Sequence, residues 1–284
     1  MRISTEILRR IRLLKKAIIS KDYVNWESVL EEILNPPEQG SFPSLVILEK
    51  RGDFGLYQIG DKKFYFPIEF DPTGVSLCYV EIFLQRFYEY KRCQVFPGDW
   101  VIDAGACEGL FSLYVLEKGA NVIAFEPVPE LAKALELTLE DYIKAGRAMV
   151  FPYGLGKRRE KVDIFVFRNW VVGSTLSGER ISYLSPDLSH CNRSSVNVIS
   201  LDELLEEGLL PPVSFIKADV EGYERELLLG ACEFIRKYKP RLSICTYHLP
   251  DDYIEIPKIV EGFGLKYRIR LVACDGTLKI MYAW

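Results

Sequence analysis

From residue 100 to residue 247 the chain alternates short apolar runs with longer segments whose apolar residues recur at helical spacing. Such runs are typical of buried parallel strands, and the segments between them are typical of helices that cover a sheet. We therefore predict an α/β fold with a mostly parallel sheet. Strands are expected at 100–102, 121–125, 148–153, 161–167, 196–200, 213–218 and 242–247, and helices at 108–117, 129–145 and 222–238.

The pattern changes at the C-terminal end of the chain. The β-like runs 265–273 and 277–282 are joined by Cys274-Asp275-Gly276, which predicts a hairpin. A parallel sheet finished by an antiparallel strand is the expected architecture. We assign residues 93–284 to this main domain and residues 1–92 to an N-terminal extension.

The extension combines helical and β-like segments. Residues 2–34 have helical periodicity with basic residues among the apolar ones, 45–67 read as a small antiparallel meander, and 75–93 have a helical period rich in aromatic residues. The basic N-terminal helix could lie on an anionic membrane surface. Packing on its own protein or on a second subunit of a homo-oligomer is the favoured interpretation, because basic amphipathic patterns are weakly specific.

Composition narrows the choice of partners and compartment. A formal net charge of −4 gives no support to nucleic-acid binding. The seven cysteines are odd in number and lack CxxC spacing, so no disulfide framework or zinc site is expected. Without an apolar run of transmembrane length or a secretion signal, a reducing cytoplasm is the expected location.

The stretch from Val101 to Pro127 has the layout of a nucleoside site. Asp103 ends the first predicted strand, Gly105 and Gly109 flank the turn, and Glu126 ends the second strand. In doubly wound sheets an acidic residue at that distance binds the ribose hydroxyls. The alternative is that the glycines only permit a tight turn and that Glu108 stabilises the helix dipole.

The loop argues against a dinucleotide. A pyrophosphate normally requires GxGxxG, but Cys107 stands at the middle glycine, and the Glu108 carboxylate lies near the helix N-terminus. A ligand with a sulfonium and an ammonium group, and without phosphate, would tolerate Asp103 and Glu108 nearby. S-adenosylmethionine is the predicted ligand.

Candidate chemistry follows the predicted strands 213–218 and 242–247. Asp219 ends 213–218 and His248 follows 242–247, so both are predicted at the ligand edge of the sheet, where a histidine could accept a hydroxyl proton. Glu221 either contacts the acceptor or, like Glu224, supplies charge to the next helix. Three further sets are weaker candidates: Ser174 and Thr175 in the insertion 169–195, the aromatic row Tyr79, Phe83, Phe87 and Tyr90, and a magnesium site of Asp219, Asp251 and Asp252.

Several motifs in order resemble the FkbM family of S-adenosylmethionine-dependent methyltransferases. They are VIDAGACEGLFSLYV, AFEPVPE, YGLG, GST, ISLDEL, IKADVEGYERELLLGA and YHLPDD, from about Phe96 onward. The resemblance implies a Rossmann-like class I methyltransferase fold. It also implies that Glu126 holds the ribose and that the methionine portion is held by Asp103, Gly105, Ala106, Glu108 and Gly109. The predicted cofactor site further includes Cys107, Pro127, Gly154 and Asp219.

The expected function is methyl transfer to a hydroxyl of a sugar, a glycan or a glycosylated natural product, with His248 and Asp219 as catalytic candidates. The proposed acceptor contacts are Ser174, Thr175, Glu221 and His248. Three alternatives stay open: an N- or carboxyl-methyltransferase of the same fold, a nicotinamide-dependent oxidoreductase, and a non-catalytic module that binds the cofactor or a glycan.

Overall fold

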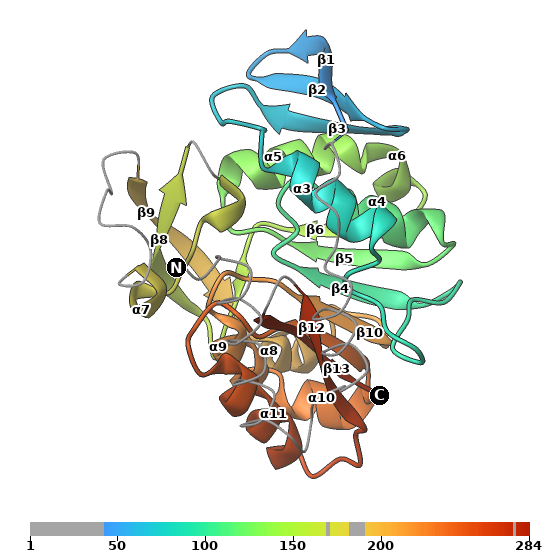
Figure 1. Cartoon of the computed structure of the whole chain (residues 1–284), viewed down its shortest axis with the longest axis vertical. Coiled ribbons are helices and arrows are strands. Elements are labelled where there is room, and N and C mark those ends of the chain that lie inside the picture. Colours follow the sequence, from blue (N-terminus) through green and yellow to red (C-terminus); the bar gives the residue numbers. More distant parts are fainter. Residues whose placement is uncertain (1–42, 169–170, 182–190, 275–276) are drawn as a thin grey trace, which may run out of the picture.

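The computed structural model describes residues 43–168, 171–181, 191–274 and 277–284 (Figure 1). Its centre is a seven-stranded sheet in the order β12-β13-β11-β10-β4-β5-β6. Strands β11, β10, β4, β5 and β6 run parallel, and β13 pairs antiparallel with β11 and β12. The predicted parallel sheet with an antiparallel end is confirmed. The strands are β4 (Trp100–Ala104), β5 (Asn121–Phe125), β6 (Ala148–Phe151), β10 (Phe215–Ala218), β11 (Arg241–Cys245), β12 (Ile269–Cys274) and β13 (Thr277–Ala283).

Helices cover both faces of this sheet because alternate strand residues point to opposite sides. Val101, Val122 and Phe215 belong to one buried cluster, whereas their neighbours Ile102 and Ile123 belong to the other. The first cluster contains α4 (Leu110–Glu117) and α5 (Pro129–Thr138), which α6 (Glu140–Lys144) follows. The second contains α8 (Leu201–Glu206), α9 (Glu224–Leu229), α10 (Cys232–Tyr238) and α11 (Asp252–Gly262).

The predicted meander is an antiparallel sheet of β1 (Leu45–Arg51), β2 (Phe54–Ile59) and β3 (Lys62–Pro67). It lies against α5 at the top of Figure 1, where the backbone N–H of Tyr65 donates to Thr138 Oγ1 at 2.8 Å. Phe64 and Phe66 are fully buried in the same cluster as α4 and α5. The hydrophobic core therefore continues across the predicted boundary between 1–92 and 93–284, and the division into two domains stays a prediction.

The predicted helix 75–93 is much shorter than its periodicity suggested. It consists of α3 (Val75–Tyr79) and a π-helical turn, η1 (Val80–Leu84), and then the backbone turns away with Arg86 at φ 52°. Phe87 and Tyr88 are buried beyond this turn, so their aromatic pattern reflects burial of a loop. The predicted helices 129–145 and 222–238 are each divided in two, and α8 and α11 were not predicted.

A third, small sheet borders the ligand edge of the central one. It contains β7 (Gly154–Leu155), β8 (Glu160–Phe167) and β9 (Cys191–Ile199) in the order β7-β9-β8. Two short helices, η2 (Val171–Gly173) and α7 (Gly178–Ile181), lie between β8 and β9 in the chain. Residues 161–167 and 196–200 are therefore strands as predicted, but outside the central sheet. The predicted helices at 2–34, and residues 169–170 and 182–190 of the insertion, lie outside the described residues.

None of the helices in the described ranges combines the length and the apolar character needed to cross a bilayer.

The turns that follow β4 and β10 are packed directly against each other. Gly105 has φ +74°, and a Cβ added there would lie 2.0 Å from the carbonyl oxygen of Asp219. Both the backbone conformation and the lack of space therefore require glycine. This contact fixes the distance between the glycine loop and the acidic turn.

We predict that Gly105→Ala destabilises the protein far more than Gly146→Ala. Both glycines have a positive φ, +74° and +70°, but a Cβ at Gly146 meets nothing within 4 Å. The control should cost about 1–2 kcal/mol for the left-handed backbone alone. Gly105→Ala should cost about 1–3 kcal/mol more because two backbones must separate. Urea unfolding measures both, and equal losses would contradict the close contact.

Candidate active site

The backbone of the glycine loop is held from both sides. The N–H groups of Gly105 and Ala106 both donate to the carbonyl oxygen of Phe125 at 3.1 Å. Cys107 adopts a positive φ of 44°, and Gly109, at φ +86°, starts α4. The loop thus turns back over the carboxyl end of β5, where the predicted ribose ligand Glu126 stands.

Glu126 is a fixed and buried carboxylate. Its Oε2 accepts the N–H of Cys107 and its Oε1 accepts the N–H of Val128, both at 2.9 Å. Burial raises the pKa of Glu126 to about 7, although the two N–H donors act in the opposite direction. Each carboxylate oxygen can accept a further hydrogen bond, so a ribose diol can still bind.

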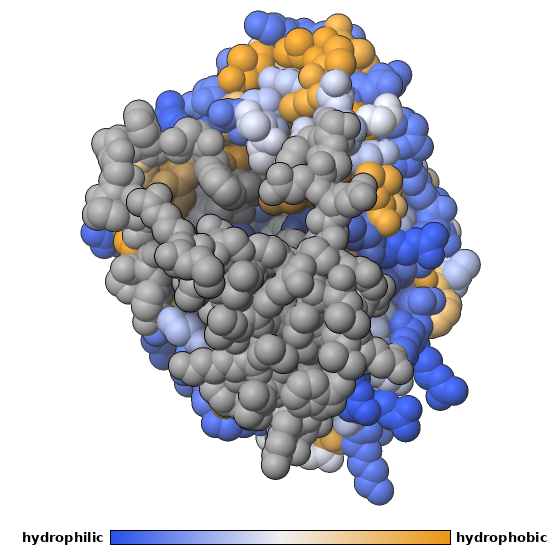
Figure 2. All heavy atoms as spheres, in the orientation of Figure 1, coloured by the Kyte–Doolittle hydropathy of each residue, from blue (hydrophilic) through white to orange (hydrophobic). Residues whose placement is uncertain are grey.

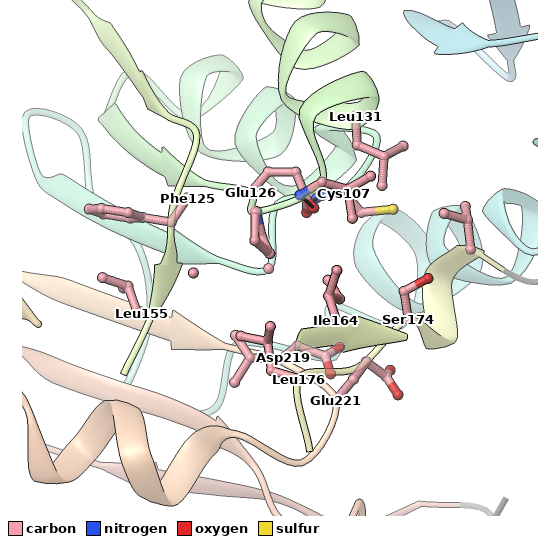
Figure 3. Close-up of a pocket in the computed structure, with 16 residues that line it drawn as sticks. Cys107, Phe125, Glu126, Leu131, Leu155, Ile164, Ser174, Leu176, Asp219 and Glu221 are labelled. Atoms are coloured by element: carbon pink, nitrogen blue, oxygen red, sulfur yellow. Dashed lines mark hydrogen bonds between the residues drawn. The ribbon is translucent and has the colours of Figure 1, made fainter. Parts of the chain in front are cut away.

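Glu126 faces a mainly apolar cavity of about 570 Å³. Figure 3 shows Glu126 and Cys107 on one side of it and Asp219, Leu176 and Glu221 on the other. A mainly apolar lining with a few polar groups is typical of small-ligand sites. The described lining residues are Gly105, Cys107, Phe125, Glu126, Pro127, Val128, Leu131, Gly154, Leu155, Ile164, Val171, Ser174, Leu176, Asp219, Val220 and Glu221.

A second cavity of about 410 Å³ shares Gly105, Cys107, Asp219 and Glu221 with the first. Its other described lining residues are Cys78, Ile82, Tyr88, Ala106, Glu108, Phe111 and Lys217. The Glu108 carboxylate is buried, and its Oε2 has no hydrogen-bond partner. Burial raises the pKa of Glu108. An unpaired buried carboxylate is costly, and an ammonium group in this cavity would satisfy it.

Asp219 links the second cavity to the segment after η1. Its Oδ2 accepts a hydrogen bond from the hydroxyl of Tyr88 at 2.5 Å. Its Oδ1 lies 3.4 Å from His248 Nε2 and is buried without a hydrogen bond. Burial alone would raise the pKa of Asp219, but the charges of His248 and Lys217 lower it. Asp219 therefore stays ionised at the junction of the two cavities.

His248 lies behind the cavity wall among three carboxylates. Its Nδ1 lies 2.8 Å from Glu224 Oε1, and its Nε2 lies 3.4 Å from both Asp219 Oδ1 and Glu221 Oε1. Burial alone would lower the pKa of His248, but Glu224 and Glu221 raise it to about 10. We therefore revise the prediction that His248 is the base, because an imidazolium has no free lone pair for a proton.

Glu224 does more than supply charge to a helix. Its side chain is buried, with Oε1 accepting the N–H of Val220 and Oε2 accepting the N–H of Gly222. The same Oε1 faces His248 Nδ1. One carboxylate thus shapes the turn between β10 and α9 and fixes the orientation of the imidazole.

Glu221 is held in a left-handed conformation, with φ 56°. The hydroxyl of Thr175 donates to its backbone oxygen, and Arg180 of α7 pairs with its Oε2. Left-handed non-glycine residues tend to occur at functional sites, where the surroundings enforce them. Thr175 therefore positions Glu221 through its backbone oxygen and does not line the cavity, whereas its neighbour Ser174 lines the first cavity.

The candidate magnesium ligands do not come together. Arg225 binds Asp251 at 2.5 Å and Asp252 at 2.7 Å. Within the described ranges, the one group of potential ligand atoms within 4.8 Å of one another belongs to Asp219, Glu224 and His248. Glu224 in that group already accepts two backbone N–H groups. The weak candidate set of Asp219, Asp251 and Asp252 is therefore not supported.

Most predicted cofactor and acceptor residues line one of the two cavities. These are Gly105, Ala106, Cys107, Glu108, Glu126, Pro127, Gly154, Ser174, Asp219 and Glu221. Four predicted residues do not line either cavity: Asp103, Gly109, Thr175 and His248. For these four we replace the predicted contact with cofactor or acceptor by a supporting role. Asp103 is fully buried against Ser112 and Lys217, and Gly109 packs against Leu135.

The aromatic row Tyr79, Phe83, Phe87 and Tyr90 does not line either cavity. Its members make stacked or edge-to-face ring contacts with one another or with Tyr114, Tyr88 and Tyr282. The sequence reasoning missed Lys217 and Tyr88, which do line the second cavity. A lysine inside the apolar run SFIKAD was a usable signal, because a buried lysine needs a partner. Tyr88 had no such local signal.

The chain is similar to several known proteins. Residues 103–267 match the model of the methyltransferase FkbM domain. The chain is 28% identical over 182 residues to AMB antimetabolite synthetase AmbE of Pseudomonas aeruginosa, covering 54% of this chain and 8% of that protein. It is 29% identical over 180 residues to methyltransferase sdnD of Sordaria araneosa, covering 55% of this chain and 68% of that protein.

A third relative is 31-O-demethyl-FK506 methyltransferase FkbM of Streptomyces tacrolimicus, 27% identical over 173 residues, with 54% of this chain and 66% of that protein covered. Among solved structures, methyltransferase FkbM from Methylobacillus flagellatus is 21% identical with a TM-score of 0.49. That match covers 75% of this chain and 52% of the other.

We predict that His248 stays protonated well above neutral pH. The chain has two histidines, so in a His190→Gln variant the imidazole signals belong to His248 alone. Nitrogen-15 NMR should show the imidazolium signature at pH 8 and its loss near pH 10, following the raised pKa. A titration midpoint near 6.5 would contradict the assignment.

The same protonation should appear in stability. Because the folded pKa of about 10 lies above the unfolded value of 6.5, His248 stabilises the fold fully below pH 6.5. This contribution is lost as the pH rises through about 10. The difference in unfolding free energy between wild type and His248→Gln should therefore shrink over that range.

Proposed function

The chain belongs to the methyltransferase FkbM domain family, and on that basis we propose that it transfers the methyl group of S-adenosylmethionine to a hydroxyl of a sugar, a glycan or a glycosylated natural product. The observation that carries the proposal is the Glu126 carboxylate, fixed by two backbone N–H groups at the edge of a mainly apolar cavity. A nucleoside requires that combination of diol acceptor and apolar walls.

The second cavity fits the other half of the cofactor. Glu108 offers a buried oxygen without a partner, and Asp219 and Glu221 bring further negative charge to the junction of the cavities. A positively charged sulfur compound with an ammonium group satisfies these carboxylates, whereas a diphosphate would be repelled by them. This charge pattern disfavours the nicotinamide alternative.

S-adenosylmethionine, when bound, supplies an electrophilic methyl group on sulfur, so the carbon–sulfur bond breaks as the carbon–oxygen bond forms. Positioning accounts for most of the acceleration of such an in-line displacement. We assign the hydroxyl proton to Asp219, which lines both cavities and whose pKa is lowered by the charges of His248 and Lys217 against the effect of burial. His248 acts as a positioning residue that holds the charge of Asp219 and Glu221 in place.

One relative supports a hydroxyl acceptor more than an amine or a carboxylate, because its name is 31-O-demethyl-FK506 methyltransferase. The chain spans only 8% of AmbE and 66% of that FkbM relative, so their whole-protein activities are not transferred. A reducing cytoplasm remains part of the proposal, consistent with free thiols at Cys78, Cys93, Cys107, Cys191, Cys232 and Cys245.

We predict that Glu126→Gln weakens binding of S-adenosylhomocysteine roughly 10- to 100-fold, because a hydrogen bond to a charged group contributes about 1.5–3 kcal/mol. Isothermal titration calorimetry measures the affinity. Glu130→Gln, the same change at an exposed position of α5, is the matched control and should bind like wild type. Tight binding of NAD in place of S-adenosylhomocysteine would instead favour the oxidoreductase.

We predict that Asp219→Asn lowers methyl transfer about 10²- to 10⁴-fold, the usual range for loss of a general base. The assay incubates the enzyme with isotopically labelled methyl donor and cell extract, and mass spectrometry identifies labelled acceptors. Asp141→Asn, an exposed change on α6, is the control. Labelled products bearing N-methyl or ester groups would overturn the hydroxyl assignment, and cofactor binding without any labelled product would favour the non-catalytic module.

A further inference from the structure

Lys217 is a buried cation in the middle of the central sheet. It lies on β10 directly opposite Asp103 of β4, where the two parallel strands pair. Its side chain is 5% exposed, and along the second cavity it is the one cationic residue among those that the structure describes. Burying an ammonium group is costly unless its hydrogen bonds are satisfied, so its partners show what it does there.

All three N–H donors of Lys217 have partners. The Nζ atom donates to Asp103 Oδ1 at 3.1 Å, to Ala104 O at 3.2 Å and to Gly105 O at 2.9 Å. The rings of Tyr88 and Phe111 lie 5.2 and 5.8 Å away and enclose the ammonium group. Two of the three hydrogen bonds therefore end on backbone carbonyls of the glycine loop.

Those two carbonyls belong to a peptide segment that is also held by its N–H groups. Gly105 N and Ala106 N donate to Phe125 O on the neighbouring strand, while Ala104 O and Gly105 O turn to Lys217. The loop is thus held between β5 and β10 by opposite sides of the same peptides. Asp103 orients Lys217, and Ser112 donates to the other oxygen of Asp103 at 2.7 Å.

We propose that Lys217 is the positioning residue that holds the cofactor loop in its binding conformation before the cofactor arrives. This proposal rests on the proposed function, which identifies the ligand as S-adenosylmethionine. It adds the residue that arranges the binding loop in advance. Such a preformed loop lowers the ordering cost of binding. A lysine that served only as counter-ion of Asp103 would not need the two carbonyl contacts.

Holding the loop and acting as counter-ion of Asp103 can be separated in a variant in which Asp103 carries no charge. Lys217→Met alone would leave Asp103 buried and unpaired, which destabilises the fold whatever the role of Lys217. In the Asp103→Asn background, Lys217→Met removes the loop contacts without leaving an unpaired carboxylate at position 103. Lys217→Gln in that background keeps two N–H donors and is the conservative member of the series.

We expect S-adenosylhomocysteine to bind at least tenfold more weakly to Asp103→Asn/Lys217→Met than to Asp103→Asn, with Lys217→Gln intermediate. Calorimetry measures the affinities, and urea midpoints identify the members of the series that are folded. Equal affinities across the folded members would overturn the proposal. If the methionine variant does not fold, the comparison of Gln with Lys decides in the same way.

Hydrogen exchange of the empty protein gives a readout that does not depend on the cofactor. The amides of Gly105 and Ala106 should exchange faster when Lys217 is replaced in the Asp103→Asn background, while the amides that pair β5 with β6 keep their protection. Unchanged exchange at Gly105 and Ala106 would overturn the proposal that Lys217 holds the loop. If wild type failed to bind S-adenosylhomocysteine, the proposed function would fail, and the exchange result would still decide the role of Lys217.

Discussion

The contact between the turns after β4 and β10 is the constraint on which the site depends. Gly105 lies so close to the carbonyl oxygen of Asp219 that no side chain fits between them. This contact places a loop suited to a nucleoside cofactor directly beside the acidic turn from Asp219 to Glu221. It also explains why the two cavities share residues of both turns and are not separate pockets.

Charge is concentrated at this junction at a cost that a purely structural core would avoid. Glu108, Glu126 and Asp219 are largely or fully buried carboxylates, and the cations that offset them within the described site are Lys217, His248 and Arg180. Buried titratable groups with shifted pKa values cluster at functional sites. Glu108 lines the second cavity and has a buried carboxylate oxygen without a hydrogen-bond partner, which is an arrangement that a cationic ligand would complete.

The sequence predicted the sheet and the cofactor half of the site because both depend on local patterns. Apolar runs marked the strands. The spacing from Gly105 to Glu126 predicted that the glycine loop and Glu126 lie together, and in the structure the N–H of Cys107 donates to Glu126. The state of His248 could not be predicted in this way, because its pKa depends on Glu224 and Glu221 brought to it by folding. The aromatic segment after residue 84 misled the helix assignment, since burial of Phe87 and Tyr88 in a loop gives the same composition as a helix face.

The two halves of the site differ in where their residues come from. The described residues that line the first cavity all lie within 105–221, inside the matched family domain 103–267. The second is closed by Cys78, Ile82 and Tyr88, which precede that domain and belong to the segment with the π-helical turn. π-helical turns frequently mark functional sites. The nucleoside half of the proposed cofactor site therefore lies within the part of the chain shared with the family. The half proposed for the charged end of the cofactor is completed by a segment that precedes that part, so the match to the family constrains this end of the site less than the nucleoside end.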